Sequence, residues 1–183
     1  MNIISPTGFW IEENEVHVFI PELSKEIIAH IKKNNIKSVY DFGCGNGDYL
    51  HEITKYNPKI AATGFEGHII DVSFKNVIKK DLVEPFDMPP VDLVISIEVG
   101  EHIPKEFEQI FIDNITKSAT KNIILSWAIV GQGGMGHINC QNNDYIISEV
   151  TKRGWVFDVE TTAIVREKMP PLWIKNTIMF FNK

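Results

Sequence analysis

The sequence predicts an α/β protein with a doubly wound, mostly parallel sheet of seven strands, an antiparallel last strand and helices on both faces. Apolar runs typical of strands alternate along the chain with segments whose apolar residues recur at helical spacing. Directly behind the first strand-like run, glycines stand at three alternate positions, where a strand would pass into a helix. The 183 residues, without a linker or repeat, favour one domain with a single core.

Each expected element follows from its residue pattern. Residues 22–35 carry apolar side chains at one-face spacing and predict a helix, whereas residues 91–99 are nearly all apolar, as in a strand covered on both faces. Pro104 suits the first turn of a helix, whose expected buried face is Phe107, Ile110, Phe111 and Ile115. The other strands are expected at 38–43, 60–67, 76–82, 122–128, 155–165 and 176–183, and the other helices at 48–56 and 143–154. Because only residues 166–175 with a Pro-Pro turn join the last two strands, these are expected to be antiparallel.

Composition and charge narrow the classes of function. With a net charge of −6 and a pI of about 5.5, the chain is not expected to bind nucleic acid through an overall positive charge. No run of about eighteen apolar residues exists, so no membrane span is expected, and the N-terminal residues lack the pattern of a signal peptide, which favours the cytoplasm. Cys44 and Cys140 predict neither a disulfide framework nor a zinc cluster.

The three glycines mark a ligand site. In a doubly wound sheet, ligands bind beyond the carboxyl ends of the strands, where bare backbone allows close approach. Gly43, Gly45 and Gly47 alternate, so the third glycine comes one residue too early for the G-x-G-x-x-G pattern of dinucleotide-binding proteins. Asp41 stands two positions before the first glycine. A nucleotide-dependent oxidoreductase is therefore a disfavoured alternative.

Asp-x-Gly-x-Gly-x-Gly resembles the first motif of the class I S-adenosylmethionine-dependent methyltransferases. The resemblance implies that the glycine turn packs against the methionyl part of the cofactor, and that Asp41 helps to hold the turn and the cofactor's amino group. Glu66, at the end of the second strand, matches the carboxylate that takes both ribose hydroxyls, which suits its two acceptor oxygens. Asp81 and Leu82 match the positions that meet the adenine amino group and ring. Further cofactor contacts are implied for residues in or beside these motifs: Gly43, Cys44, Gly45, Gly47, Gly67, Ile97 and Glu98.

A second group of functional residues follows the fourth strand. Glu98, Glu101 and His102 would share one face of a helical turn, and two carboxylates with an imidazole suit magnesium or manganese. The pattern resembles two metal-using methyltransferase groups, one acting in the ubiquinone pathway and one on the terminal 2′-hydroxyl of small RNAs, where a later histidine, here His137, completes the site. In metal-free members of the superfamily, a similar Glu-His pair shapes the floor of the pocket. His102 is then the first candidate for a general base, beside His137, since its free pKa lies near working pH.

Two further segments are expected at the rim of the pocket. The glycine-rich residues 126–144 leave the fifth strand, and their neutral donors and acceptors suit a hydroxyl-rich acceptor: Gln132, His137, Asn139 and Gln141. The N-terminal residues 7–19 carry Phe9, Trp10 and Phe19, which either cover the cofactor or pack as ordinary core. The chain is thus expected to comprise one methyltransferase domain, 1–183, with an N-terminal lid and helix, 1–35, and a Rossmann-like core, 36–183.

The predicted function is methyl transfer from S-adenosylmethionine to an oxygen or nitrogen of a small hydroxyl-rich acceptor such as a sugar or another metabolite. "SIEV" replaces the Asn/Asp-Pro-Pro-aromatic signature of amino-methylating enzymes, and no Pro-Cys pair of cytosine-C5 enzymes exists. One alternative is a metal-dependent O-methyltransferase acting on a quinol or on an RNA 3′-terminal 2′-hydroxyl. Another is a non-catalytic cofactor-binding partner subunit.

Overall fold

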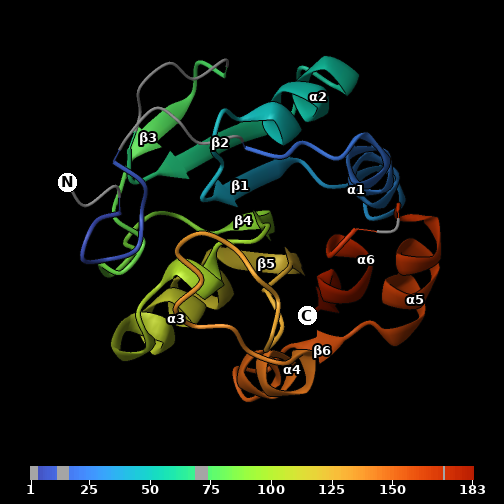
Figure 1. The fold of residues 1–183 in the computed structure, drawn as a ribbon. Helices are drawn as coiled ribbons and strands as arrows, with labels where there is room; N and C mark the ends of the chain where they lie inside the picture. The colour runs from blue at the N-terminus through green and yellow to red at the C-terminus, as the bar shows by residue number, and fades with distance from the viewer. Residues whose placement is uncertain (1–3, 12–16, 69–73, 171) are drawn as a thin grey trace.

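A seven-stranded sheet runs through the centre of the chain, in the order β3-β2-β1-β4-β5-β7-β6 (Figure 1). The computed structural model describes residues 4–11, 17–68, 74–170 and 172–183. The strands are β1 (Ser38–Phe42), β2 (Ala61–Glu66), β3 (Val77–Lys79), β4 (Val91–Ser96), β5 (Ala119–Leu125), β6 (Val156–Phe157) and β7 (Met179–Asn182). From β1 the chain builds first towards β3 and then towards β5, so the switch point of the sheet lies between β1 and β4.

Strand direction agrees with the prediction. β1 pairs in parallel with β2 and β4, and the outer pairs β2–β3 and β4–β5 are also parallel. β7 is antiparallel to both of its neighbours, β5 and β6. The expected α/β class with an antiparallel last strand is confirmed.

Helices cover both faces of the sheet (Figure 1). On one face α1 (Pro21–Lys33), α2 (Asp48–Tyr56), α5 (Val159–Lys168) and α6 (Ile174–Thr177) share a core with Val39 and Ile124, and on the other α3 (Glu108–Ser118) and α4 (Asn143–Thr151) share one with Tyr40 and Ile123. Adjacent strand residues serve opposite cores, as the alternation of a strand requires. Across the part of the chain that the structure describes, no helix is long and apolar enough to cross a bilayer.

The prediction of a strand over 155–165 was wrong. Only Val156–Phe157 forms a strand, and α5 begins directly after it, so helices α5 and α6 separate β6 from β7. The Asp158 carboxylate accepts a hydrogen bond of 2.9 Å from the Thr161 backbone N–H and caps α5. The β-branched residues of this segment resemble a strand in composition, but the cap and the inward Val165 fix a helix.

Candidate active site

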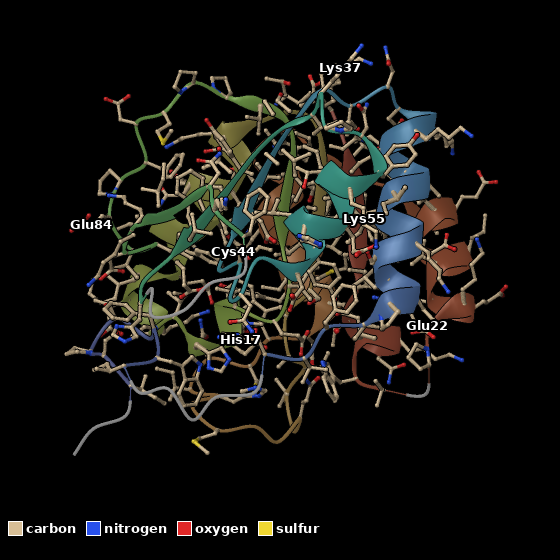
Figure 2. The ribbon with its side chains drawn as sticks, turned by 90° about the horizontal axis from the view of Figure 1, so that it is seen from above. His17, Glu22, Lys37, Cys44, Lys55 and Glu84 are labelled. Atoms are coloured by element: carbon tan, nitrogen blue, oxygen red, sulfur yellow. The ribbon has the colours of Figure 1, made fainter. Side chains whose placement is uncertain are left out.

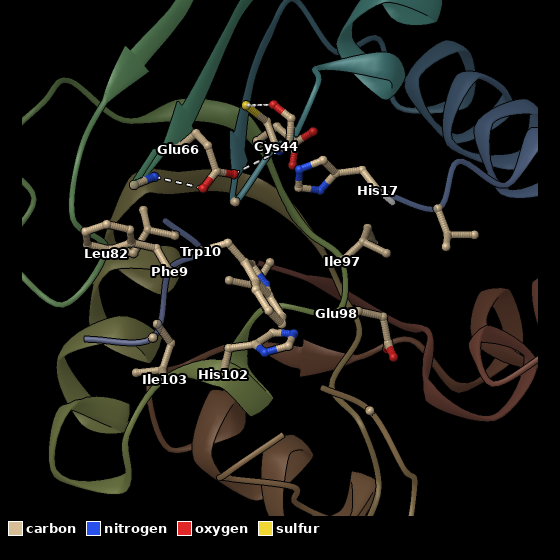
Figure 3. Close-up of a pocket in the computed structure, with 18 of the residues that line it drawn as sticks. Phe9, Trp10, His17, Cys44, Glu66, Leu82, Ile97, Glu98, His102 and Ile103 are labelled. Carbon is tan, nitrogen blue, oxygen red and sulfur yellow. Dashed lines mark hydrogen bonds between the residues drawn. The ribbon is translucent and has the colours of Figure 1, made fainter. Parts of the chain in front are cut away.

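A cavity of about 420 Å³ lies at the carboxyl ends of β1, β2 and β4 (Figure 3). Its walls come from the N-terminal segment, from the turn 43–47 after β1, and from the loop 126–142 between β5 and α4. Figure 2 shows Cys44 and His17 close together on this side, whereas Lys37, at the start of β1, lies at the opposite end of the sheet. Most residues singled out from the sequence line the cavity: Asp41, Gly43, Cys44, Gly45, Glu66, Gly67, Asp81, Leu82, Ile97, Glu98, His102 and His137.

Gly47 and Glu101, also singled out from the sequence, do not line the cavity. Gly47 has a φ of +80° and stands as the residue before α2, where a side chain would meet Phe74. Glu101 is fully buried beneath the cavity floor. The third glycine of the motif therefore sets the turn into the helix and does not face the cavity.

Glu66 holds the turn 43–47 in place. One carboxylate oxygen accepts a hydrogen bond of 2.9 Å from the Gly45 N–H, and the other accepts one of 2.8 Å from the Gly67 N–H (Figure 3). Each oxygen has a second lone pair and can accept a further hydrogen bond. Glu66 thus combines a structural role with free acceptor capacity beside the cavity.

Asp41 is a buried carboxylate at the base of the same turn. It is 2% exposed, and its Oδ2 has no hydrogen-bond partner. Burial, and next the nearby charge of Glu66, raises the pKa of Asp41 to about 8. A ligand with a positive group would compensate this carboxylate, so the site fits the amino group of an amino-acid-like ligand.

Cys44 has a structural position. It is buried, its thiol donates to the Gly45 carbonyl at 3.7 Å, and a side chain at Gly64 would approach its sulfur to 2.5 Å. Burial raises the pKa of the thiol, and the charges of Asp41 and Glu66 raise it further. Cys44 therefore stays protonated and contributes packing and backbone to the turn.

Asp81 and Leu82 are ordered by contacts on both sides. The Asp81 carboxylate accepts a hydrogen bond of 2.7 Å from the Thr7 hydroxyl and one of 3.2 Å from the Val83 N–H. The carbonyl of Leu82 accepts a hydrogen bond of 2.9 Å from the Asn114 side-chain amide. The segment after β3 is thereby fixed to α3 and to the N-terminal segment.

The N-terminal segment touches the cavity at Phe9, which the sequence singled out, and at His17, which it did not. The Phe9 ring packs on Gly67, and the exposed His17 ring lies against Gly45, 2.6 Å from where a Cβ would stand (Figure 3). No spacing pattern joins these residues to the motifs after β1 and β2. A ligand lying against Gly45 must therefore pack on the His17 ring or displace it.

The structure divides the predicted metal set. Glu98, with a φ of +53°, points away from His102 (Figure 3). Its carboxylate accepts a hydrogen bond of 2.8 Å from the Gln132 amide and one of 3.0 Å from the Thr177 hydroxyl. The expectation of one shared helical face was wrong for Glu98, because the short 3₁₀ turn Gly100–His102 begins after it.

Glu101, His102 and His137 form one cluster, with a ligand atom of each within 4.8 Å of the others. The ring nitrogen Nδ1 of His102 lies 3.2 Å from the Gly136 carbonyl, and Nδ1 of His137 lies 3.3 Å from the Gln132 carbonyl. These contacts assign the N–H to Nδ1 and leave Nε2 free in both rings. The His137 Nε2 is 3.9 Å from Glu101 Oε1.

Charge in this cluster is suppressed by burial. Neither oxygen of the Glu101 carboxylate has a hydrogen-bond partner. Burial, followed by the charge of Glu98, raises its pKa well above the usual value, and the nearby N–H groups of Glu101 and Ala128 offset only part of this. Burial, followed by His137, lowers the pKa of His102 to about 4. A neutral His102 is a weak base at pH 7 and a suitable ligand for a cation.

The loop 126–142 presents fewer polar groups than expected. The carbonyl of Glu101 accepts from the N–H groups of Ile138 and Asn139, which ties the loop to the cavity floor. The buried Asn139 amide donates a hydrogen bond of 2.9 Å to the Glu108 carboxylate, and the Gln141 amide donates one of 2.7 Å to the Asn139 side-chain oxygen. Of the four polar residues singled out there, only Gln132 and His137 line the cavity.

Comparison with solved structures places this architecture among methyltransferases. No protein-family model and no curated protein matches the sequence. The magnesium protoporphyrin IX methyltransferase (ChlM) from Synechocystis PCC 6803 with bound SAM is similar at 15% identity and a TM-score of 0.63, over 88% of this chain and 78% of that chain. The methyltransferase domain of bacterial CtHen1-C is similar at 17% identity and a TM-score of 0.64, over 88% of this chain and 96% of that chain.

A third similar structure is the small RNA methyltransferase HEN1, at 16% identity and a TM-score of 0.64, over 94% of this chain and 27% of that chain. Identities this low establish the architecture and leave the chemistry to the site itself. The chain has the fold of the class I S-adenosylmethionine-dependent methyltransferases.

Proposed function

We propose that the chain is an S-adenosylmethionine-dependent methyltransferase that acts on a hydroxyl oxygen. The single observation that carries this proposal is the order of carboxyl groups around one cavity: Asp41 near the end of β1, Glu66 at the end of β2 and Asp81 just after β3. Each stands at the carboxyl end of a neighbouring parallel strand, where doubly wound sheets bind nucleosides. We name this part of the cavity, with the turn 43–47, the cofactor end.

The residues at the cofactor end fit S-adenosylmethionine one by one. The unpartnered oxygen of Asp41 suits the cationic amino group, and the remaining lone pairs of Glu66 suit the ribose hydroxyls. Asp81 suits the adenine amino group. When bound, the cofactor supplies a methyl group on a positively charged sulfur, which is already activated towards a nucleophile.

The other part of the cavity, with Glu101, His102 and His137, is the acceptor end of the proposal. His137 lines the cavity, and its Nε2 faces Glu101, so His137 is placed to take the acceptor proton, and the charge it then carries would favour the ionised form of Glu101. The low pKa of His102 disfavours it as the base and favours it as a ligand. The turn 43–47 would position the cofactor, and the rings of His102 and His137 would orient the acceptor oxygen. This alignment is the main requirement of a direct displacement.

The acceptor end also fits a divalent ion. Glu101, His102 and His137 would hold it, with both rings oriented by backbone carbonyls. Two imidazoles with one carboxylate favour manganese over magnesium, because magnesium prefers oxygen ligands. An ion held there would lower the pKa of an acceptor hydroxyl.

The proposal retains the expected division into a lid and helix, 1–35, and a core, 36–183. It is supported by Thr7 on Asp81 and by Phe9 on Gly67, two contacts that carry the N-terminal segment across the cofactor end. The proposal also includes a cytoplasmic location.

A calorimetric titration of S-adenosylmethionine tests the cofactor part. Gly45→Arg should abolish binding, because a side chain at this positive φ would fill the cavity. Gly154→Arg is the matched control, since Gly154 also has a positive φ of +81° but has open space around it. Equal binding by wild type and Gly45→Arg would remove the turn from the proposal. Undiminished transfer in EDTA, with no ion found by elemental analysis, would remove the metal.

A further inference from the structure

Acidic side chains and histidines line the cavity. Carboxylates line it at Asp41, Asp48, Glu66, Asp81 and Glu98, and among the described lining residues there is no lysine or arginine. The sequence itself has no lysine or arginine in residues 1–24 or 122–151, which supply the N-terminal segment and the loop 126–142. Phosphate groups are bound in proteins mainly by such cations, so a phosphate-bearing acceptor finds no partner here.

The wall beside the reacting groups is aromatic. The rings of Trp10 and His102 meet edge to face, with centroids 5.6 Å apart and an interplanar angle of 69° (Figure 3). A side chain at Gly136 would contact Ile4, His102 and Trp10, so the N-terminal segment and the loop 126–142 close on each other at this point. Trp10 is half-buried and lines the cavity, which leaves part of its ring available to a ligand.

The mouth of the cavity is apolar as well. Met135 and Val18 both line it and are 61% and 50% exposed. Two neutral polar side chains of the loop 126–142 are engaged within the protein: Gln132 with Glu98, and Asn139 with Glu108. Exposed apolar groups around a concave site indicate a ligand with an apolar surface.

We infer that the acceptor is an uncharged hydroxyl compound with a flat apolar body, such as a phenol or hydroquinone, whose ring packs against Trp10 beside His102. This inference rests on the proposed function and names the class of its acceptor. Aromatic packing holds the ring, and the hydroxyl then lies towards His137 and Glu101. A sugar could stack a C–H face on Trp10 but would present its hydroxyls to the apolar mouth, and an RNA end carries phosphates that the lining carboxylates repel.

Ligand-observed saturation-transfer NMR on the full chain, with manganese omitted to avoid paramagnetic broadening, tests the inference. Three probes compete: an alkyl-substituted hydroquinone, methyl glucoside and a short RNA with a free 3′ end. Saturation should pass to the ring protons of the hydroquinone, and Trp10→Ala should weaken its binding about ten-fold whereas Trp10→Phe should keep most of it. Preferred binding of the glucoside or the RNA, or no contact with the hydroquinone, would overturn the inference.

A charge insertion provides the second variant in case Trp10→Ala disturbs the fold. Met135→Lys places a cation at the mouth and should raise RNA binding several-fold, whereas Met88→Lys, at an exposed methionine ahead of β4, should not. RNA binding that is already strong in the wild type and equal in both variants would contradict the inference. Calorimetry of S-adenosylmethionine on the same samples separates the two ideas: loss of cofactor binding would end the proposed function, whereas intact cofactor binding without hydroquinone contact would end the inference alone.

Discussion

The two ends of the cavity differ in how their acidic groups are satisfied. At the cofactor end, both oxygens of Glu66 accept backbone N–H groups, and Asp81 accepts a hydroxyl and an N–H, whereas Asp41 keeps one oxygen, Oδ2, without a partner among the described residues. At the acceptor end, Glu101 is fully buried with neither oxygen hydrogen-bonded. The arrangement of Glu66 and Asp81 is rigid before any ligand arrives, whereas the second places a costly unpaired group next to two imidazoles.

The comparison indicates different tasks for the two ends. A carboxylate held by its own backbone presents its remaining lone pairs in fixed directions, which suits recognition of a nucleoside. A buried carboxylate without partners gains stabilisation from a cation or from a proton, which suits chemistry at that point.

The largest effect is expected for Glu101→Gln. Removing the anionic ligand from the cluster should weaken manganese binding by at least about 100-fold, since even loss of an outer partner costs about 10-fold to 100-fold. Binding of S-adenosylmethionine should stay unchanged, because Glu101 does not line the cavity. Manganese titration followed by electron paramagnetic resonance measures the first quantity and calorimetry the second.

Glu98→Gln is the matched variant for this prediction. Its carboxylate is engaged by Gln132 and Thr177, so its replacement should change manganese affinity by less than about 10-fold. Equal losses in Glu98→Gln and Glu101→Gln would show that all four predicted residues act together.

Glu66→Gln should have the next largest effect, at the opposite end. The amide NH₂ of glutamine would face the N–H of Gly45 or Gly67, leaving one buried donor without an acceptor. Such a mismatch costs about 1–3 kcal/mol, which predicts a loss of S-adenosylmethionine affinity of about 10-fold to 100-fold. Manganese affinity should not change.

Glu84→Gln provides the control, since the Glu84 side chain is 62% exposed and its carboxylate pairs with Lys80. Surface pairs of this kind contribute little, so cofactor affinity should equal that of the wild type. A drop in manganese affinity in Glu66→Gln would contradict the independence of the two ends.

The cofactor end was largely predictable from sequence, because its residues follow consecutive strands. The parallel sheet brings the carboxyl ends of β1, β2 and β3 to one edge, so spacing alone places Asp41, Glu66 and Asp81 around one cavity. The roles assigned to these residues remain predictions. Thr7 and His17 were missed, because a segment that crosses the sheet edge has no periodicity relating it to the strands.

The acceptor end was less predictable, because it depends on contacts between loops. His137 joins Glu101 only because the carbonyl of Glu101 binds the N–H groups at 138 and 139. The separation of Glu98 follows from its left-handed backbone, which no propensity foretells for glutamate. The same limit applies to α5, where β-branched composition outweighed the capping Asp158 in the prediction.

Asp41 predicts a pH dependence of cofactor binding. Because its pKa is raised to about 8, it carries a proton below that pH, and a cationic amino group would favour the ionised form. Binding should therefore release a proton, and affinity should rise about ten-fold per pH unit up to about pH 8. Calorimetry in buffers of different ionisation enthalpy measures the released proton, and Asp41→Asn should abolish the slope. A flat profile in the wild type would remove Asp41 from contact with the amino group.

The smallest effect is expected for Thr7→Val, which tests whether the N-terminal segment acts as a lid over the cofactor end. The substitution keeps the shape of the side chain and removes the 2.7 Å hydrogen bond to Asp81. A bond of this kind contributes about 1 kcal/mol, so the dissociation rate of S-adenosylmethionine should rise about five-fold in stopped-flow measurements. Thr54→Val is the matched control, because the Thr54 hydroxyl bonds within α2, to the carbonyls of Leu50 and His51. If both variants release the cofactor equally fast, the segment packs over the cavity without retaining the ligand, and the Trp10 end of the same segment must close independently of Thr7.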